Sequence, residues 1–394
     1  MPNLKHASLE TIYWSIKYDL STFFRKLRNK PTTPTFDEED DGDDEPIDDT
    51  SDEYEVTFNT QLDSLNTVLC DEKLTKDIRH LKINNVFNKW ENFTVLSKHL
   101  ATLDLSNLTS LTIWVSGRYL GDGEEAAKIL AQLPQLSNLT ELGLIRTGIG
   151  DKGAFALSQS PHLAKLTNLR LIENISDEGI KALTQLSNLR QVDFSNNTIH
   201  NKNHISNESV KALAQLSNLT ELSLCSSQID DNIAKDLAQL TNLQCFCLSG
   251  SKMGDESAKA LAQLPDLTLI ACYSGSMIGD EGAKALAQSP KLTHLMLEAS
   301  QIGNEGVLAL AAMPNLTRLF LMDDKIDMDG IKSLAALPNI PKSTHVTVKK
   351  KRGIMARIFK KTLLEWSAED MYENKYVHEH YGNEELQSLA DKNL

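Results

Sequence analysis

The sequence lacks the features of a membrane-spanning or disulfide-rich secreted protein. No apolar run approaches the roughly 18 residues that a membrane-spanning helix requires. The first 30 residues do not resemble a secretory signal, because Glu10, Lys17 and Asp19 interrupt the apolar positions. Cysteine is scarce, and an odd count of five in 394 residues does not fit a disulfide framework. We therefore expect a protein of a reducing, cytoplasmic compartment without a transmembrane segment.

The sequence also lacks the motifs that carry most enzymatic and metal chemistry. It contains no G-x-x-x-x-G-K-[ST] phosphate loop, no G-x-S-x-G nucleophile turn and no H-E-x-x-H zinc pair. Cys245 and Cys247 are separated by one residue, whereas zinc sites generally use cysteine pairs with a spacer of about two to four residues. We therefore predict no catalytic residue, no metal ligand and no cofactor.

Acidic charge is concentrated in one short segment. Residues 37–55 hold 13 acidic residues and no Lys or Arg, and without these 13 acids the net charge of −14 becomes −1. Together with Pro31, Pro34 and Pro46, this composition predicts that residues 30–55 form an acidic, disordered linker. The rest of the chain has no excess of basic charge, so we expect no nucleic-acid partner.

What the sequence does contain is an internal repeat. An L-x-x-L-x-L pattern recurs at intervals of 23 to 31 residues. The leucines at its first position, called position 0, are Leu108, Leu139, Leu166, Leu189, Leu219, Leu243, Leu267, Leu292 and Leu316, and Ile340 begins a degraded copy. Apolar residues at positions +3 and +5 alternate with position +4, which predicts one face of a short strand.

A helix pattern follows each strand pattern. A Gly-Asp-Glu-Gly segment such as 279–282 comes first, and because Asp is a preferred N-cap, we expect it to cap the helix that it begins. These carboxylates recur in most copies, which favours a structural role over a catalytic pair. An Ala-Lys-Ala-Leu segment then predicts the helix, and prolines such as Pro265 and Pro314 end it.

The nine copies resemble the leucine-rich repeat, most closely the ribonuclease-inhibitor-like class. This resemblance covers residues 108–340 and implies an α/β solenoid (horseshoe) with a parallel concave sheet and convex helices. The copies are shorter than usual, and residues such as Thr147 and Ser251 replace the usual Asn at +8, so we expect a less regular ladder of the same fold. Short repeats of this kind also resemble those of bacterial effectors delivered into a host cell, which implies such a role here.

Three further segments flank the array. Residues 1–29 are expected to form an amphipathic helix, with an apolar face over 9–27 that packs on the array or binds a partner or membrane. Residues 56–107 are apolar enough for an N-terminal cap with degenerate repeats. Residues 341–394 are expected to form a C-terminal cap, in which His345–Val348 supplies a last edge strand.

A basic segment follows that strand. We predict a basic amphipathic helix over 349–366, which either caps the solenoid, pairs with the acidic linker or lies on an anionic membrane. The residues predicted to contact a membrane or partner are Lys350, Lys351, Arg352, Arg357, Lys360, Lys361 and Trp366. This segment supports an alternative function, a membrane-associated adaptor anchored by residues 349–366.

The most informative positions are +2, +4 and +6, which face away from the helices and line the concave side. They are mostly polar in the early repeats and become apolar or aromatic from the Leu243 repeat onward. The residues predicted to bind a partner are Cys245, Cys247, Leu269, Tyr273, His294, Met296, Arg318, Phe320 and Met322. Tyr, Phe, Met and Arg are typical of protein-binding hot spots, so the sequence predicts a non-catalytic module that binds another protein.

We expect Tyr273, Met296, Arg318 and Phe320 to contribute most of the affinity. The alternative is that the C-terminal segment folds back and covers this face.

Overall fold

The computed structural model divides the chain into two units, Met1–Asp52 and Glu53–Leu394. The first unit holds no described residue, so the helix predicted over 9–27 and the acidic linker up to residue 54 lie outside the described part. The described residues are 55–58, 78–86, 92–116, 123–172, 175–195, 205–226, 228–273, 275–298, 301–323, 325–327, 329–330, 343–350 and 353–359.

The second unit is built on one sheet whose 13 strands follow each other in sequence order. Every neighbouring pair is parallel except the last, in which β13 runs antiparallel to β12. The strands are β1 (Glu55–Phe58), β2 (His80–Val86), β3 (Ser110–Ser116), β4 (Glu141–Ile145), β5 (Asn168–Ile172), β6 (Gln191–Phe194), β7 (Glu221–Cys225), β8 (Cys245–Ser249), β9 (Leu269–Tyr273), β10 (His294–Glu298), β11 (Arg318–Asp323), β12 (Ser343–Lys350) and β13 (Gly353–Phe359).

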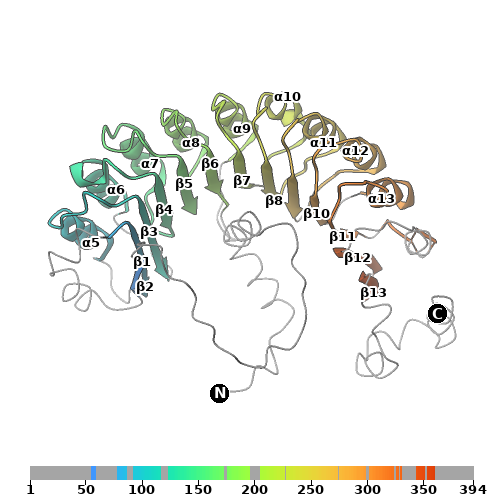
Figure 1. Cartoon of the computed structure of the whole chain (residues 1–394), viewed down its shortest axis with the longest axis horizontal. Helices are drawn as coiled ribbons and strands as arrows, with labels where there is room; N and C mark the ends of the chain where they lie inside the picture. The colour runs from blue at the N-terminus through green and yellow to red at the C-terminus, as the bar shows by residue number, and fades with distance from the viewer. Residues whose placement is uncertain are drawn as a thin grey trace, which may run out of the picture. The chain divides into compact units, whose positions relative to one another are not determined.

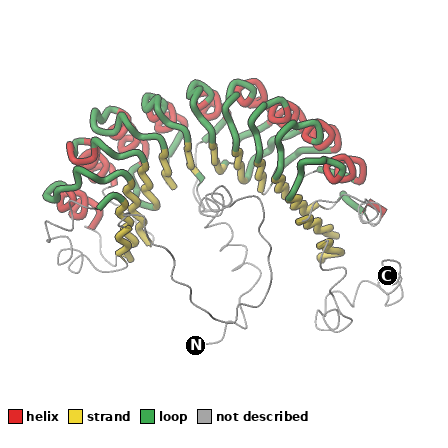
Figure 2. The backbone as a smooth tube through the Cα atoms, in the orientation of Figure 1, coloured by secondary structure: helices red, strands yellow, loops and turns green. Residues whose placement is uncertain are grey.

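Helices alternate with these strands and cover one face of the sheet, on the outer side of the array (Figures 1 and 2). They are α5 (Asn92–Leu100), α6 (Gly123–Ala131), α7 (Gly150–Ser158), α8 (Asp177–Leu183), α9 (Asn207–Leu213), α10 (Ala234–Leu237), α11 (Asp255–Ala262), α12 (Asp280–Leu286) and α13 (Asn304–Ala311), with 3-10 turns η1 (Pro134–Leu136) and η2 (Asp231–Ile233). The predicted fold, an open parallel sheet with convex helices, is confirmed.

The apolar positions of each repeat form a continuous core between sheet and helices. In the β10 repeat, Leu292, Leu295 and Leu297 have no exposed surface, whereas His294 and Met296 between them are half-buried on the opposite face. This alternation follows from the period of two along a strand. Each repeat therefore buries its apolar face only against its neighbours, as in other solenoids.

A ladder of side-chain hydrogen bonds precedes the strands. Thr293 at position +1 donates its hydroxyl to the carbonyl of Thr268, one repeat earlier, at 3.0 Å. Thr317 donates in the same way to the carbonyl of Thr293 at 3.0 Å, and Asn315 donates to the carbonyl of Pro290 at 3.0 Å. The carbonyls of Thr268 and Thr293 also accept backbone N–H groups from the following repeat, so the side-chain bonds add to a backbone contact that already joins neighbouring repeats.

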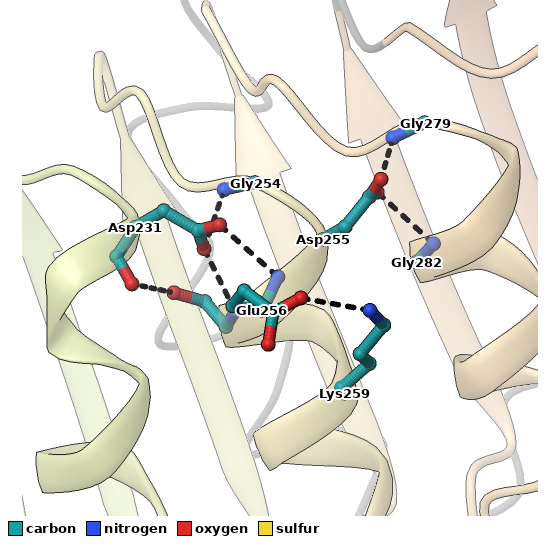
Figure 3. Close-up of polar contacts among 8 residues, drawn as sticks. Asp231, Gly254, Asp255, Glu256, Lys259, Gly279 and Gly282 are labelled. Carbon is teal, nitrogen blue, oxygen red and sulfur yellow. Dashed lines mark hydrogen bonds and ion pairs between the residues drawn. The ribbon is translucent and has the colours of Figure 1, made fainter.

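The aspartates at the helix starts cap the next helix rather than their own, which corrects the interpretation of the Gly-Asp-Glu-Gly segment. The N-cap of α12 is Gly279, which has no capping side chain of its own. Oδ1 of Asp255, the first residue of α11, accepts hydrogen bonds from the backbone N–H groups of Gly279 at 2.7 Å and Gly282 at 3.0 Å (Figure 3). Asp280 repeats this contact with Gly303 and Gly306 of the α13 repeat.

The same contact explains the second glycine of the segment. A Cβ added to Gly282 would lie 2.5 Å from Oδ1 of Asp255 and 3.0 Å from the Cβ of Ala258. Glycine at this position therefore makes room for the carboxylate of the preceding repeat. Where serine stands there instead, as at Ser209, its hydroxyl donates to the carboxylate of Asp177.

The prediction of a basic helix over 349–366 is wrong for the residues of this range that the structure describes, which are 349–350 and 353–359. Residues 343–350 and 353–359 form an antiparallel pair, with Val346 opposite Ile358 and Val348 opposite Ala356. The apolar residues of this segment fit a period of two as well as a helical period, and pairing with β11 and β12 favours the strands. His345–Val348 lies within a strand, as predicted, but β13 is the last strand of the described sheet.

In the described part of the chain, none of the helices combines the length and the apolar character that crossing a bilayer requires.

Neutralising one inter-repeat cap should weaken the array in a pH-dependent way. Burial opposes the ionisation of Asp231, but hydrogen bonds from Ser257, Glu256 and Gly254 outweigh it, so the pKa of this carboxyl lies below its ordinary value. We expect Asp231→Asn to lower the free energy of unfolding by about 1–2 kcal/mol at pH 7. Because the folded-state pKa is depressed, this stabilisation exists above the unfolded value of 3.8 and disappears as the pH falls through the folded one.

Urea unfolding of both proteins at pH 7 and near pH 3 measures this difference. Glu256→Gln is the matched control, because Glu256 is exposed and its side chain forms an ion pair with the surface residue Lys259 at 2.7 Å (Figure 3). Equal urea midpoints for Asp231→Asn and Glu256→Gln at pH 7 would contradict the capping role.

Candidate protein-binding face

The face of the sheet that carries no helices presents ordered columns of side chains. Residues paired in register stand in line across the strands, so each repeat contributes one residue to each column. The first column runs through Glu141, Asn168, Gln191, Glu221, Cys245, Leu269, His294 and Arg318. The second runs through Gly143, Arg170, Asp193, Ser223, Cys247, Ala271, Met296 and Phe320.

The half of this face on β4–β7, called the polar half, is bonded to itself along the first column. Nδ2 of Asn168 donates to Oε1 of Glu141 at 3.3 Å and to Oε1 of Gln191 at 2.7 Å. Nε2 of Gln191 then donates to Oε1 of Glu221 at 2.8 Å. These side chains therefore satisfy one another across four strands.

The second column of the polar half is paired as well. Nε of Arg170 lies 3.1 Å from Oδ2 of Asp193, and both side chains are less than a third exposed. Asp193 also accepts hydrogen bonds from the backbone and the hydroxyl of Ser195, at 3.0 and 2.5 Å. Many side chains of the polar half are thus hydrogen-bonded to one another, which was not evident from the sequence.

The half on β8–β11, called the apolar half, has a different surface. Cys247 and Leu269 are only 8% and 5% exposed, so these two predicted contacts offer little area to a partner. Partly exposed side chains come from Cys245, Tyr273, His294, Met296, Arg318 and Phe320. Met322 lies on β11 in register with Glu298, but its side chain lies outside the described part.

Tyr273 and Met296 contact each other across two strands of the apolar half. The phenolic oxygen of Tyr273, at the end of β9, lies 3.5 Å from the sulfur of Met296 on β10. Thioether sulfur makes favourable contacts with aromatic side chains and adapts its shape to what packs on it. The pair therefore joins the second column to the end of β9 in one apolar surface.

His294 is held neutral within this surface. Nδ1 of His294 is hydrogen-bonded to the hydroxyl of Thr293, at a distance of 2.8 Å. Burial, together with the charge of Arg318, lowers the pKa of His294 to about 4. The recurring Leu-Thr pair at positions 0 and +1 could have suggested the contact with Thr293.

Two cysteines of the sheet, Cys247 and Cys272, are not poised for chemistry. Burial raises the pKa of Cys272 to about 12, and burial with neighbouring thiols and carboxylates raises the pKa of Cys247 well above its ordinary value. Thiolate is the form that attacks or binds metal, so both remain inert at neutral pH. Among the described residues, no three His, Cys, Asp or Glu side chains gather in a way that could hold a metal ion.

The basic residues of the C-terminal segment do not form one described group. Lys350 lies at the end of β12 and Arg357 lies in β13. The other predicted contacts of this segment, namely Lys351, Arg352, Lys360, Lys361 and Trp366, lie outside the described residues.

The outer surface of the helices offers less to a partner. Several of its charges are paired, for example where Lys284 contacts Glu281 at 3.1 Å and Glu305 at 2.8 Å. Large apolar side chains that are well exposed in the described part come from three separate places, at Val95, Phe155 and Met277. Single exposed apolar residues are normal on protein surfaces and do not form a binding patch.

Comparison with known proteins gives matches to the repeats and to the architecture. The Leucine Rich repeat family profile matches residues 135–158 and 288–311. No curated protein gives a significant match. An internalin C2 structure from Listeria monocytogenes is 24% identical, covers 58% of this chain and 92% of its own, and has a TM-score of 0.42. An internalin structure (inlF) from the same species is 21% identical, with coverages of 67% and 79% and a TM-score of 0.39.

The protonation of His294 is directly measurable by NMR. Its imidazole should titrate with a midpoint near 4, and Arg318→Gln should raise that midpoint while leaving it below 6.5, because burial is the larger cause. A depressed folded-state pKa means that the unfolded chain binds the proton more tightly, so His294 lowers the stability as pH falls below 6.5. A midpoint at 6.5 in the wild-type protein would rule out this burial.

Proposed function

The chain is a leucine-rich-repeat protein, and from that premise we propose that it is a non-catalytic module that binds another protein through the apolar half of its concave face. The observation that carries the proposal is the change of chemistry at β8 within otherwise continuous columns. Before β8 the columns hold hydrogen-bonded polar side chains, and after it they hold Tyr273, Met296 and Phe320, all partly exposed.

The folding of the sheet does not account for that apolar half. Core positions on the opposite face, such as Leu295 and Leu297, already bury the apolar surface that each strand requires. The polar half shows that the same columns are compatible with polar residues in this fold. A contiguous surface rich in Met, Phe, Tyr and Arg has the composition of a protein-binding hot spot.

The position of the C-terminal strands favours an accessible face. Strands β12 and β13 continue the sheet from β11 edge to edge instead of lying across it. Over the described residues, this arrangement supports partner binding rather than self-covering. The alternative of a membrane adaptor depended on a helix over 349–366, which two strands replace up to residue 359, so it is not retained.

A non-catalytic role is supported by the engagement of the repeated carboxylates. Asp231, Asp255 and Asp280 each accept two backbone hydrogen bonds from the next repeat through Oδ1, which gives these carboxylates a structural role.

Partner binding is tested by quantitative affinity capture with the full chain as bait. Phe320→Ala and Met296→Ala should each reduce recovery of a specific partner by about tenfold or more, because truncating a hot-spot residue costs about 2 kcal/mol. Ser223→Ala, in the second column of the polar half, is the matched control and should leave recovery unchanged. Unchanged urea midpoints establish that the variants are folded, and undiminished capture by folded Phe320→Ala and Met296→Ala would refute the proposed face.

Action inside a host cell is part of the same proposal and rests on the likeness of the short repeats to bacterial effector repeats. Residues 366–394 are polar and contain acids such as Glu384 and Glu385, which is the composition of an export signal. A reporter fused to the full chain should enter host cells from a secreting bacterium, and deletion of residues 375–394 should abolish entry. If both fusions enter equally, those residues do not contain the export signal. If neither fusion enters, the proposed effector role is refuted.

A further inference from the structure

Charge is distributed unequally between the two halves of the concave face. In the first and second columns, the polar half holds three acids and one cation, namely Glu141, Asp193, Glu221 and Arg170. In the same columns the apolar half holds one charged residue, Arg318, because His294 is neutral at physiological pH. Glu298, two residues beyond Met296 on β10 and in a third column, adds one acid to the apolar half, which therefore carries no net charge over the three columns. The polar half carries two net negative charges, so an anionic group is disfavoured there, and Arg318 is the cation that attracts it within the apolar half.

Arg318 stands at the corner of the apolar surface. It is in register with His294 on β10, and Phe320 lies two residues along β11 on the same face. Its side chain is half-buried, so water screens its charge only in part. A guanidinium carries five N–H donors in a planar fork, which matches a carboxylate in two-point contact and leaves donors for other contacts.

The groups around His294 make it a reporter of charge at this corner. Arg318 faces it from β11, Leu269 faces it from β9, and Glu298 lies further along its own strand. Cys245 on β8 stands one strand beyond Leu269 in the same column. A carboxylate placed on Arg318 adds negative charge beside the imidazole and favours its protonated form.

We propose that the partner presents a segment in which an Asp or Glu side chain lies next to aromatic or aliphatic side chains, with its carboxylate bound by Arg318 and its apolar groups packed on Met296 and Phe320. This inference rests on the proposed function and specifies the chemistry of the partner. The acidic polar half also orients the segment, because it excludes the carboxylate from the β4–β7 side.

The ligand preference is measurable without knowing the natural partner. Random 12-residue peptides displayed on phage are selected on the immobilised full chain, and enriched sequences are synthesised. We expect enrichment of Asp or Glu beside Phe, Trp, Leu or Met. The dissociation constant of such a peptide should rise tenfold or more for Arg318→Gln and for Phe320→Ala. Gln191→Ala, in the first column of the polar half, should leave it unchanged.

Two further measurements locate the carboxylate. Arg318→Glu should lose the acidic peptide and bind the version in which Lys replaces the acid. The NMR titration midpoint of His294 should rise in the complex with the acidic peptide and stay unchanged with its Gln version. Failure of the charge swap, or an unchanged midpoint, overturns the placement on Arg318.

The outcomes separate this inference from the proposed function. Enriched peptides that require Phe320 but show no preference for acids overturn the inference and leave the protein-binding face intact. If no enriched peptide depends on Met296 or Phe320, the inference and the proposed face fall together.

Discussion

An aspartate in the first turn of one helix accepts hydrogen bonds from the start of the next helix, and this contact recurs along the array at Asp151, Asp177, Asp231, Asp255 and Asp280. Each carboxylate lies at the positive end of the neighbouring helix and satisfies N–H groups that have no partner within it. Because the donors belong to the following repeat, the contact fixes the position of one helix relative to the next. The strands connected to those helices inherit that spacing.

The concave face depends on this spacing. Strands held in register bring one residue of each repeat into line, so a column can be a hydrogen-bonded ladder, as from Glu141 to Glu221, or an apolar surface, as at Met296 and Phe320. Both are accommodated because the sheet buries its core residues on the other face. The repeat framework thus separates what holds the fold from what recognises a partner, and only the second varies along the columns.

The repeat period and its apolar positions were sufficient to predict the sheet, the helices and the residues of each face. They were insufficient for contacts between repeats, because Asp255 has the same sequence neighbours whether it caps its own helix or the next. The strand Gly353–Phe359 was misassigned as helix because Ile354 and Ile358 fit both periods, and only pairing with β12 decides between them. Burial at Cys247 and Leu269 likewise depends on neighbouring columns that a single repeat does not reveal.

The reversal of direction at β13 bears on self-assembly. A sheet of parallel strands can in principle be extended when a second copy adds its own first strand, in the same direction, to the last strand. Within the described sheet, the last strand runs the other way and carries a bulge opposite Val348 and Lys349. A strand added beyond β13 in the direction of β1–β12 would pair with it antiparallel, so it would not prolong the parallel ladder.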